Sequence, residues 1–409
     1  MTAPLSRNRD YRLLWIGQAL SEAGSSASTI ALPLLVLVLT GSAVASGLVL
    51  GASAAAQLLV GLPAGALVDR WNRKTVMLVS EAVQAVAMAA LVVGLWWDAV
   101  GLPHVVLAVV VLGVCRALSE PAEEAALPAV VPEHHLPAAV AMNAARGYVG
   151  QLSGTALGGV LFGLARWVPF ALEAVTHVAT FLSLLFVRIP ARHRERPAHG
   201  RFHHEVRDGL KWVWHQPVVR VVAICAVGLN LFFQAFYLLM IAIAQQQGVP
   251  AGQIGVMGAM LGAGGILGAL VAPRLHRLLR PHTSIVGVFW AITALIPLAL
   301  VVDPGYPTGV LFAAAAFLAP TANTTITTYQ LLLTPDELRG RLSSVMGVAL
   351  GIAAIAGPAV GGALAGLLPP TQAILTCAGG AAALTVFATL NPTLRRFSRS
   401  EQPAEVTAD

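Results

Sequence analysis

A stripe of polar residues in the first apolar segment could carry proton and ligand chemistry. Glu22 lies about nine residues into the apolar run 13–39, where a charge facing lipid would be costly. On a helix, Gln18, Ser25 and Thr29 share its face. Such a stripe is expected to face a water-filled cavity, in which Glu22 could bind and release a proton. The alternative is a structural carboxylate with permanent hydrogen bonds.

An arginine in the fourth apolar segment is a second charged group at membrane depth. Arg116 lies in the run 103–121 and needs an anionic partner if it is buried. Glu120, one helical turn later, is the nearest candidate by spacing. An arginine that reaches water at the membrane edge is the alternative.

Polar side chains in later apolar segments are further candidates. Those predicted to contact substrate are Asn230, Gln234, Asn323 and Thr327. Hydrogen bonds between helices are the competing explanation for these residues. Glu173 and His177 lie one turn apart in the run 168–187 and could form a proton relay.

The composition indicates that these segments lie in a membrane. Of the 409 residues, 57% are apolar and 11% are charged, whereas a soluble protein has about 25% charged residues. The three cysteines lie far apart and the histidines between 193 and 215 lack metal-ligand spacing, so no disulfide, metal site or cofactor is predicted. The sequence contains no phosphate-binding glycine loop, nucleophile elbow or zinc-protease helix, which argues against an enzyme. The basic residues form no single patch for nucleic acid.

Twelve apolar segments could each cross a bilayer, at about 20 residues per crossing. They are 13–39, 43–68, 75–97, 103–121, 138–164 and 168–187, then 218–244, 253–272, 283–302, 308–333, 341–367 and 370–391. We predict an all-α membrane protein in which twelve transmembrane helices form two six-helix repeats. The predicted parts are an N-terminal bundle (1–187), a cytoplasmic linker with an amphipathic helix (188–216), a C-terminal bundle (217–391) and a cytoplasmic tail (392–409).

The basic residues predict the orientation of the chain. Of the 25 Lys and Arg residues, 22 lie in the termini or in even-numbered loops. Loops rich in Lys and Arg stay on the cytoplasmic side of a membrane. We therefore predict a multi-pass protein of the inner cell membrane with both termini in the cytoplasm.

The two halves of the sequence share motifs at one offset of 203 residues. Gly65-Ala-Leu-Val matches Gly268-Ala-Leu-Val, and the segments 154–164 and 357–367 are identical at seven of eleven positions. A duplicated six-helix half is typical of transporters that bind substrate between their repeats. Channels and membrane enzymes need no such symmetry.

The loop after the second segment reads Gly65-Ala-Leu-Val-Asp69-Arg70-Trp-Asn-Arg73-Lys74. It resembles the Gly-x-Leu-x-Asp-Arg-x-Gly-Arg-Lys signature of the major facilitator superfamily, with Asn72 in place of Gly. We predict that Gly65 allows close helix contact and that Asp69 meets Arg73 or a helix N-terminus. A short basic membrane anchor is the alternative. The resemblance also implies a role in proton coupling for Arg116, because the family carries an arginine in this segment.

A glycine pattern in the fifth segment resembles a motif of the antiporter branch of this superfamily, Gly-x(3)-Gly-Pro-x-x-Gly-Gly, with Thr155 in place of proline. Small residues four apart allow helices to approach closely and proline bends a helix, so we predict a hinge or a tight interface. Ordinary close packing is the alternative. The residues assigned to this conformational motif are Gly150, Gly154, Gly158 and Gly159, with Gly357, Pro358, Gly361 and Gly362 in the second half.

The opening of the chain, from Arg9 to Gln18, is similar to the macrolide-efflux and enterobactin-exporter branch. That branch often has Asp where this sequence has Ser25, so Glu22 is predicted to take the proton-binding role. In the superfamily, segments one, four, seven and ten line the cavity, whereas segment six, with Glu173 and His177, is peripheral.

These features together predict a secondary active transporter that works by alternating access. It would export a small, partly apolar compound, such as a drug, an antibiotic or a siderophore-like metabolite, in exchange for protons, with the lipid bilayer as its surroundings. A proton-coupled importer is the first alternative, disfavoured because only Glu22 and Arg116 are charged along the expected cavity segments. A non-transporting receptor or scaffold is the second, disfavoured by a linker of only 29 residues.

Overall fold

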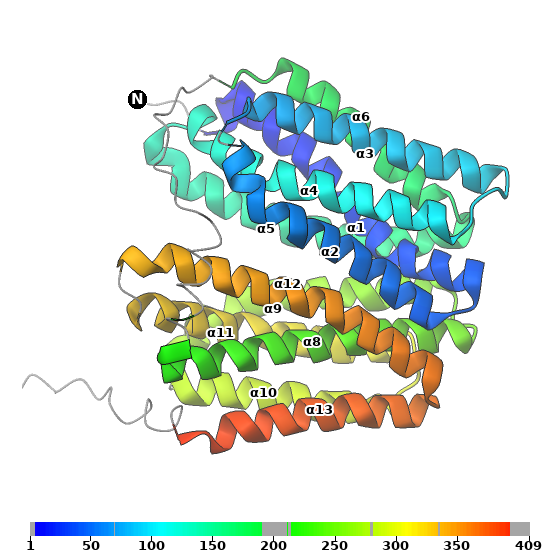
Figure 1. The fold of residues 1–409 in the computed structure, drawn as a ribbon, viewed down its shortest axis with the longest axis vertical. Helices are drawn as coiled ribbons and strands as arrows, with labels where there is room; N and C mark the ends of the chain where they lie inside the picture. Colours follow the sequence, from blue (N-terminus) through cyan, green and yellow to red (C-terminus); the bar gives the residue numbers. More distant parts are fainter. Residues whose placement is uncertain are drawn as a thin grey trace, which may run out of the picture.

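The computed structural model describes residues 5–68, 70–189, 211, 214–278, 281–333 and 336–392. Within these residues the chain forms twelve long α-helices and two short 3-10 turns, without a strand (Figure 1). The first six long helices are α1 (Arg9–Thr40), α2 (Ala43–Val68), α3 (Arg73–Trp96), α4 (Leu102–Val130), α5 (Leu136–Leu164) and α6 (Val168–Phe186). The other six are α8 (Pro217–Gln246), α9 (Ala251–Leu278), α10 (Pro281–Leu298), α11 (Tyr306–Leu333), α12 (Asp336–Leu367) and α13 (Pro370–Leu390). The predicted all-α fold of six helices and six helices is confirmed.

The largest difference from the predicted segments is the length of α4. The apolar run ends near residue 121, but α4 continues to Val130 with Pro121 and Pro128 inside it. Its last turns carry Glu123 and Glu124, which interrupt the apolar run without ending the helix. The predicted amphipathic helix of the linker and the predicted tail lie almost entirely outside the described residues.

Local capping explains where several helices begin and end. Asn8 and Asn72 precede α1 and α3, and each side chain accepts a hydrogen bond from the first turn of its helix. Gly41 ends α1 with φ at 65°, in the left-handed region that glycine enters without strain.

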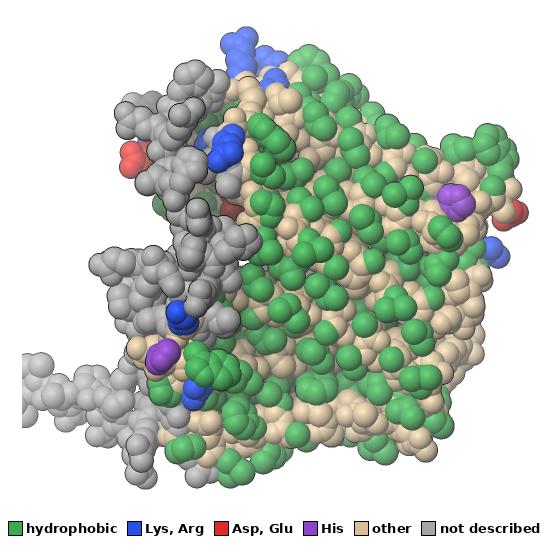
Figure 2. All heavy atoms as spheres, viewed as in Figure 1, with side chains coloured by type: hydrophobic (Ala, Val, Ile, Leu, Met, Phe, Trp, Pro, Cys, Tyr) green, Lys and Arg blue, Asp and Glu red, His purple; other side chains and the backbone are tan. Residues whose placement is uncertain are grey.

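The described helices have the composition and surface of a membrane protein. Ten of them are long and apolar enough to cross a bilayer, while α5, which is rich in glycine and polar residues, and the shorter α10 are outside this group. The face drawn in Figure 2 is covered by hydrophobic side chains, and its charged side chains lie near two opposite edges. This distribution fits an apolar belt between two aqueous sides.

The long helices form two bundles, α1 to α6 and α8 to α13, one above the other in Figure 1. The bundles meet chiefly where α5 lies beside α9 and where α2 lies beside α12. The chain enters α1 and leaves α13 at the same end of the molecule, on the left in Figure 1, which we call the termini end. The helix pairs at the interface are related by the internal repeat.

Glycines of the repeat make equivalent contacts within each bundle. A Cβ atom at Gly158 of α5 would collide with the carbonyl oxygen of Ala27 on α1. At the matching position, a Cβ atom at Gly361 of α12 would collide with the carbonyl oxygen of Ala235 on α8. The repeat found in the sequence therefore corresponds to the same helix packing in both bundles.

The neighbouring glycines make equivalent contacts between the bundles. Gly159 leaves no room for a Cβ atom beside Gly255 of α9, and Gly362 leaves none beside Ala43 of α2. The carbonyl oxygen of Pro358 would likewise collide with a Cβ atom at Gly47 of α2. These close approaches hold the two bundles together on both sides of the molecule.

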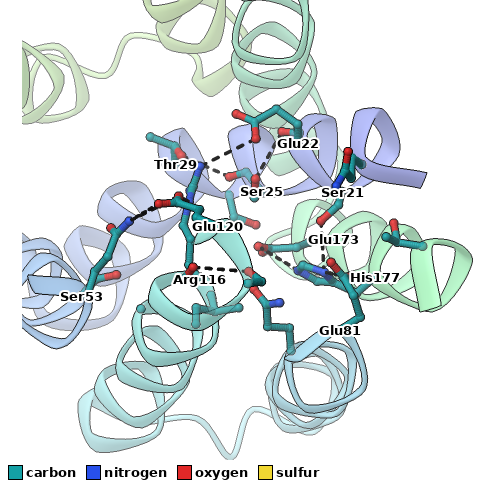
Figure 3. Close-up of a pocket in the computed structure, with 18 of the residues that line it drawn as sticks. Ser21, Glu22, Ser25, Thr29, Ser53, Glu81, Arg116, Glu120, Glu173 and His177 are labelled. Atoms are coloured by element: carbon teal, nitrogen blue, oxygen red, sulfur yellow. Dashed lines mark hydrogen bonds and ion pairs between the residues drawn. The ribbon is translucent and has the colours of Figure 1, made fainter. Parts of the chain in front are cut away.

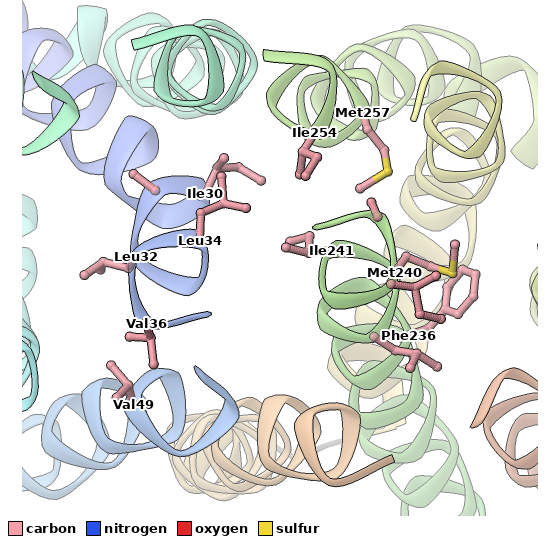
Figure 4. Packing of buried hydrophobic residues seen from close by; sticks show 14 of the residues in the cluster. Ile30, Leu32, Leu34, Val36, Val49, Phe236, Met240, Ile241, Ile254 and Met257 are labelled. Carbon is pink, nitrogen blue, oxygen red and sulfur yellow. The ribbon is translucent and has the colours of Figure 1, made fainter. Parts of the chain in front are cut away.

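One buried apolar cluster joins the bundles at the end opposite the termini. It brings together Ile30 and Leu34 of α1, Ile241 of α8, and Ile254 and Met257 of α9 (Figure 4). At the termini end, the buried clusters of the described residues belong to one bundle each. Apolar packing between the bundles therefore closes the far end of the molecule more completely than the termini end.

Candidate functional site

A polar cavity of about 190 Å³ lies inside the first bundle (Figure 3). Helices α1 to α6 all contribute to its wall. The polar and charged lining residues are Gln18, Ser21, Glu22, Ser25, Ser28, Thr29, Ser53, Gln57, Glu81, Gln84, Arg116, Ser119, Glu120, Glu123, Arg146, Glu173, His177 and Thr180. The predicted polar stripe of α1 therefore faces a cavity.

The structure brings the two predicted proton-coupling residues together. Arg116 Nη2 lies 3.7 Å from Glu22 Oε2, and Arg116 Nε donates to Glu120 Oε1 at 2.8 Å. Glu120 also accepts from the amide nitrogen of Gln57 at 3.4 Å. Arg116 thus bridges a carboxylate on α1 and a carboxylate on its own helix.

A glycine of the fifth helix makes room for Glu22. A Cβ atom at Gly150 would lie 2.6 Å from Glu22 Cγ, which is far inside van der Waals contact. One turn later, a Cβ atom at Gly154 would collide with Ser26. The glycines of α5 therefore set how closely Glu22 can lie against α5, as well as how α1 and α5 pack.

A second ion pair in the cavity wall was missed by the sequence analysis. Arg146 Nη2 of α5 lies 2.7 Å from Glu123 Oε1 of α4, and Arg146 also donates to Gln18 Oε1. The side chains of Arg146 and Glu123 are 12% and 23% exposed. The position of Arg146 within an apolar segment is the signal that could have identified it.

A third group of charged residues lies between α3 and α6. His177 Nδ1 is 2.7 Å from Glu81 Oε2, and His177 Nε2 is 3.7 Å from Glu173 Oε1. The spacing of Glu173 and His177 indicated a possible relay, but Glu81 was not identified although it lies in an apolar run. The expectation that only Glu22 and Arg116 are charged along the expected cavity segments is wrong, because Glu120 of α4 also lines the cavity. With the residues from α3, α5 and α6, the described wall contains five carboxylates, two guanidinium groups and an imidazole.

Two basic residues in the first turn of α3, Arg73 and Lys74, bind neighbouring helices near their C-terminal ends. Arg73 Nη1 donates to the carbonyl oxygen of Ala125 near the end of α4 at 2.8 Å. Lys74 Nζ donates at 2.9 and 2.8 Å to the carbonyl oxygens of Leu185 and Val187 at the end of α6. Cations are favourable at helix C-termini, so these contacts tie the start of α3 to α4 and α6.

The other three residues assigned to the motif 65–74 are Gly65, Asp69 and Arg70. Gly65 is exposed, and a Cβ atom there would meet no described atom within 4 Å, so the predicted close helix contact is wrong at this position. Its repeat partner Gly268 does make such a contact, with the backbone of Phe317 on α11. Arg70 is exposed, and Asp69 lies outside the described residues.

A larger cavity of about 760 Å³ lies in the second bundle, among α8, α9, α10 and α11. Most of its wall is apolar, and Asn230, Asn323 and Thr324 are its polar side chains, with Gln151 reaching it from α5. Of the predicted substrate-contacting residues, Gln18, Ser25 and Thr29 thus line the first cavity, and Asn230 and Asn323 line the second.

Gln234, a predicted substrate-contacting residue, does not line either cavity in the described structure. Gln234 lies on α8 where it meets α12, since a Cβ atom at Gly357 would be 2.6 Å from Gln234 Cβ. Gln234 is not part of the wall of the second cavity. Thr327 lies on α11, and its side chain is outside the described residues.

Comparison with protein families places the whole chain in one transporter group. The family described as "Transmembrane secretion effector" matches residues 1–407. The enterobactin exporter EntS of Escherichia coli O1:K1 is 26% identical over 422 residues, which cover 97% of this chain and 95% of EntS. The multidrug efflux pump Tap of Mycobacterium bovis is 28% identical over 378 residues, covering 85% and 84% of the two chains.

Comparison with solved structures identifies the fold. The nucleoside transporter NupG, crystallised as a point mutant, superimposes with a TM-score of 0.77 at 11% identity, covering 93% of this chain and 99% of NupG. A bacterial homologue of the iron transporter ferroportin, solved in an inward-facing state, gives a TM-score of 0.70 at 16% identity, with 97% and 100% coverage. At these identities the likeness concerns the arrangement of the helices alone.

Proposed function

This chain belongs to the transmembrane secretion effector family of major facilitator transporters, and from that premise we propose that it exports a small, partly apolar compound in exchange for protons. It is a membrane transporter and not an enzyme. The proposed cargo is a drug, an antibiotic or a siderophore-like metabolite. The names of the relatives, an enterobactin exporter and a multidrug efflux pump, support export.

The observation that carries the proposal is the Glu22–Arg116 pair in the wall of the polar cavity. The Glu22 side chain is 28% exposed, so protons from cavity water can reach it. Protonation would remove its charge and weaken its attraction to Arg116. Arg116 would keep Glu120 as its partner at 2.8 Å, so proton binding leaves no isolated charge. Glu22 can therefore change its proton occupancy at low cost.

The two cavities support a substrate with a polar part and an apolar part. Gln18, Ser25 and Thr29 offer hydrogen bonds in the first bundle. The second cavity is large enough for a drug-sized group and offers Asn230 and Asn323 beside apolar walls. The substrate would bind between the bundles, with its polar part toward α1 and its apolar part toward α8 and α11.

Alternating access would consist of the two bundles rocking against each other. The glycine contacts of α5 with α9 and of α12 with α2 supply close, smooth interfaces for this motion. The apolar cluster around Ile30 and Ile241 would separate when the far end opens. One inward proton releases about 2.3 kcal/mol per 100 mV and about 1.4 kcal/mol per pH unit, enough for a substrate gradient of some hundreds-fold.

The orientation of the chain is also part of the proposal. Lys and Arg residues concentrate in the termini and the even-numbered loops, which supports cytoplasmic termini in the inner membrane. In that orientation the closed cluster lies on the outer side. The structure would then represent an inward-facing state, ready to take substrate from the cytoplasm.

The test is a bacterial strain that lacks its own efflux pumps and expresses this chain. Its tolerance to a panel of macrolides, cationic dyes and catecholate siderophores is measured together with compound retention. Export predicts higher tolerance and lower retention of at least one compound, and loss of both effects when a protonophore removes the proton gradient. Higher retention would indicate an importer, and an unchanged strain across the panel would contradict transport of these classes.

A further inference from the structure

We propose that Glu81, Glu173 and His177 form a second proton-binding site, separate from the Glu22–Arg116 pair. This inference rests on the proton-coupled function proposed above and extends it. The three residues come from α3 and α6, whereas Glu22 and Arg116 come from α1 and α4. We call them the α3–α6 cluster (Figure 3).

The geometry of the α3–α6 cluster places two carboxylates on one imidazole. Glu81 Oε2 lies 2.7 Å from Nδ1 of His177, and Glu173 Oε1 lies 3.7 Å from Nε2. The side chains of His177 and Glu173 are each 2% exposed. Glu173 Oε2 is buried without a hydrogen-bond partner among the described residues, so this oxygen can accept a proton.

The arginines around the cluster are already engaged with other carboxylates. Arg116 of α4 pairs with Glu22 and Glu120, and Arg146 of α5 pairs with Glu123. The charge of Arg116 also acts on Glu173, and the nearby Cys115 of α4 offers Glu81 a thiol and no positive charge. From α1, Ser21 faces His177 with an uncharged hydroxyl group. His177 is therefore the only described ion-pair partner of Glu81 and Glu173.

This imbalance of charge requires protons. With a neutral imidazole and two ionised carboxylates, the cluster would bury two negative charges. One proton on His177 forms an imidazolium and leaves one negative charge, and a second proton on a carboxylate oxygen leaves none. Burial disfavours net charge, and closely spaced groups titrate as a unit, so the cluster binds at least one proton and can exchange it.

The α3–α6 cluster has a route to the substrate region. Glu81, Glu173 and His177 line the same polar cavity as Glu22 and Arg116. Ser21 Oγ lies 3.4 Å from His177 Nδ1 and stands next to Glu22 on α1. Water in the cavity could carry a proton between the two sites. Because the charge of Arg116 acts on both Glu22 and Glu173, protonation of one site would change the proton affinity of the other.

A metal ion is the other ligand that a histidine and two carboxylates could hold. Among the described residues, no group of three or more His, Cys, Asp or Glu side chains has the arrangement of a metal site. The close Glu81–His177 hydrogen bond also occupies a nitrogen that a metal would need. The geometry therefore points to protons.

The experiment is infrared difference spectroscopy of the full chain without substrate, in vesicles of phosphatidylethanolamine and phosphatidylglycerol. Spectra are recorded between about pH 5 and pH 10, a range that includes the titration of an imidazole held by two carboxylates. A buried carboxylic acid gives a C=O stretching band that an ionised carboxylate lacks. We expect a pH-dependent band that loses a component in Glu81→Gln or Glu173→Gln, that shifts in pH in His177→Asn, and that persists in Glu22→Gln.

Glu124→Gln is the matched control, because this exposed residue of α4 is outside the cavity wall and should leave the buried component unchanged. A spectrum of Glu81→Gln and Glu173→Gln identical to that of the wild type would overturn the proposal. If these variants fail to fold, nuclear magnetic resonance of the wild type with labelled histidine decides. A His177 signal that titrates in one step, as an isolated histidine does, would also overturn the proposal.

Efflux of each compound of the panel, measured in the same vesicles, separates this inference from the proposed function. A wild type that shows the band but moves no compound of the panel would contradict export while the second site stands. Proton-driven export without the band would contradict the second site alone.

Discussion

The two bundles share one helical scaffold but place different chemistry inside it. The described lining of the first cavity, about 190 Å³, includes five carboxylates and two guanidinium groups. The second cavity is four times larger, at about 760 Å³, and its described lining contains no charged side chain. Long charged side chains fill the space in the first bundle that short alanines leave open in the second. The repeat thus preserves helix packing, while the side chains make one cavity charged and the other mainly apolar.

The first helices of the two bundles, α1 and α8, can be matched residue by residue. Gly158 meets Ala27 as Gly361 meets Ala235, so α1 and α8 correspond at an offset of 208 residues. Glu22 then corresponds to Asn230, and both face the cavity of their own bundle. One scaffold position carries a group that can change its charge in the first bundle and a neutral amide in the second.

The largest expected effect comes from breaking the charge network that lines the first cavity, which has no equivalent in the described lining of the second. Arg146→Met should destabilise the chain by about 2 to 3 kcal/mol, because the half-buried Glu123 carboxylate would lose its charged partner. Thermal unfolding in detergent measures this loss. Arg146→Met combined with Glu123→Gln should recover most of it, and a single variant as stable as the wild type would show that the pair is not needed.

The next largest expected loss of stability should be equal in the two bundles, because the substituted glycines make equivalent helix contacts. Gly158→Ala and Gly361→Ala should each destabilise the chain by about 1 to 3 kcal/mol, since the new Cβ atom would collide with a carbonyl oxygen. Gly287→Ala on α10 is the control, because its Cβ atom meets no described atom within 4 Å and should be neutral or stabilising. Unequal costs at the two matched positions would weaken the equivalence of the bundles.

A third effect should be confined to the second bundle. Ala319→Phe would fill part of the apolar cavity and should raise the apparent KM for an exported dye by about tenfold, corresponding to about 1.4 kcal/mol of lost binding. The response of transport to the pH gradient should stay as in the wild type. An unchanged KM would remove the second cavity from the substrate site.

The smallest expected loss of stability comes from a substitution at Lys74, in the first turn of α3. Lys74→Met removes two hydrogen bonds to the end of α6 and should cost about 0.3 to 1 kcal/mol. Differential scanning fluorimetry can detect this shift. Lys211→Met, at an exposed position outside both cavities, should change the unfolding temperature less.

Much of the fold could be predicted because each membrane helix corresponds to one continuous apolar run in the sequence. The end of α4 was missed because Glu123 and Glu124 interrupt the apolar run while the backbone stays helical. Helical spacing also identified Arg116 with Glu120, and Glu173 with His177, since both pairs lie one turn apart.

The pairs of the site that join distant helices were not accessible in this way. Glu81 and His177 are 96 residues apart, and Arg146 and Gln18 are 128 residues apart. Periodicity shows which face of a helix is polar but not which helix covers it. Likewise, the sequence could not show that Gly65 and Gly268, which occupy matching repeat positions, differ in contact.

The most direct measurement compares Glu22 with its counterpart in the second bundle. Efflux of a transported dye from vesicles is measured with and without an imposed pH gradient for the wild type, Glu22→Gln, Glu120→Gln and Asn230→Ala. Glu22→Gln should reduce the ratio of the two rates to about one. Glu120→Gln should give an intermediate ratio, because protonation of Glu22 would then leave Arg116 without a carboxylate partner. Asn230→Ala should keep the wild-type ratio because it leaves both carboxylates in place. A wild-type ratio in Glu22→Gln would contradict the assignment of proton exchange to the first bundle through Glu22.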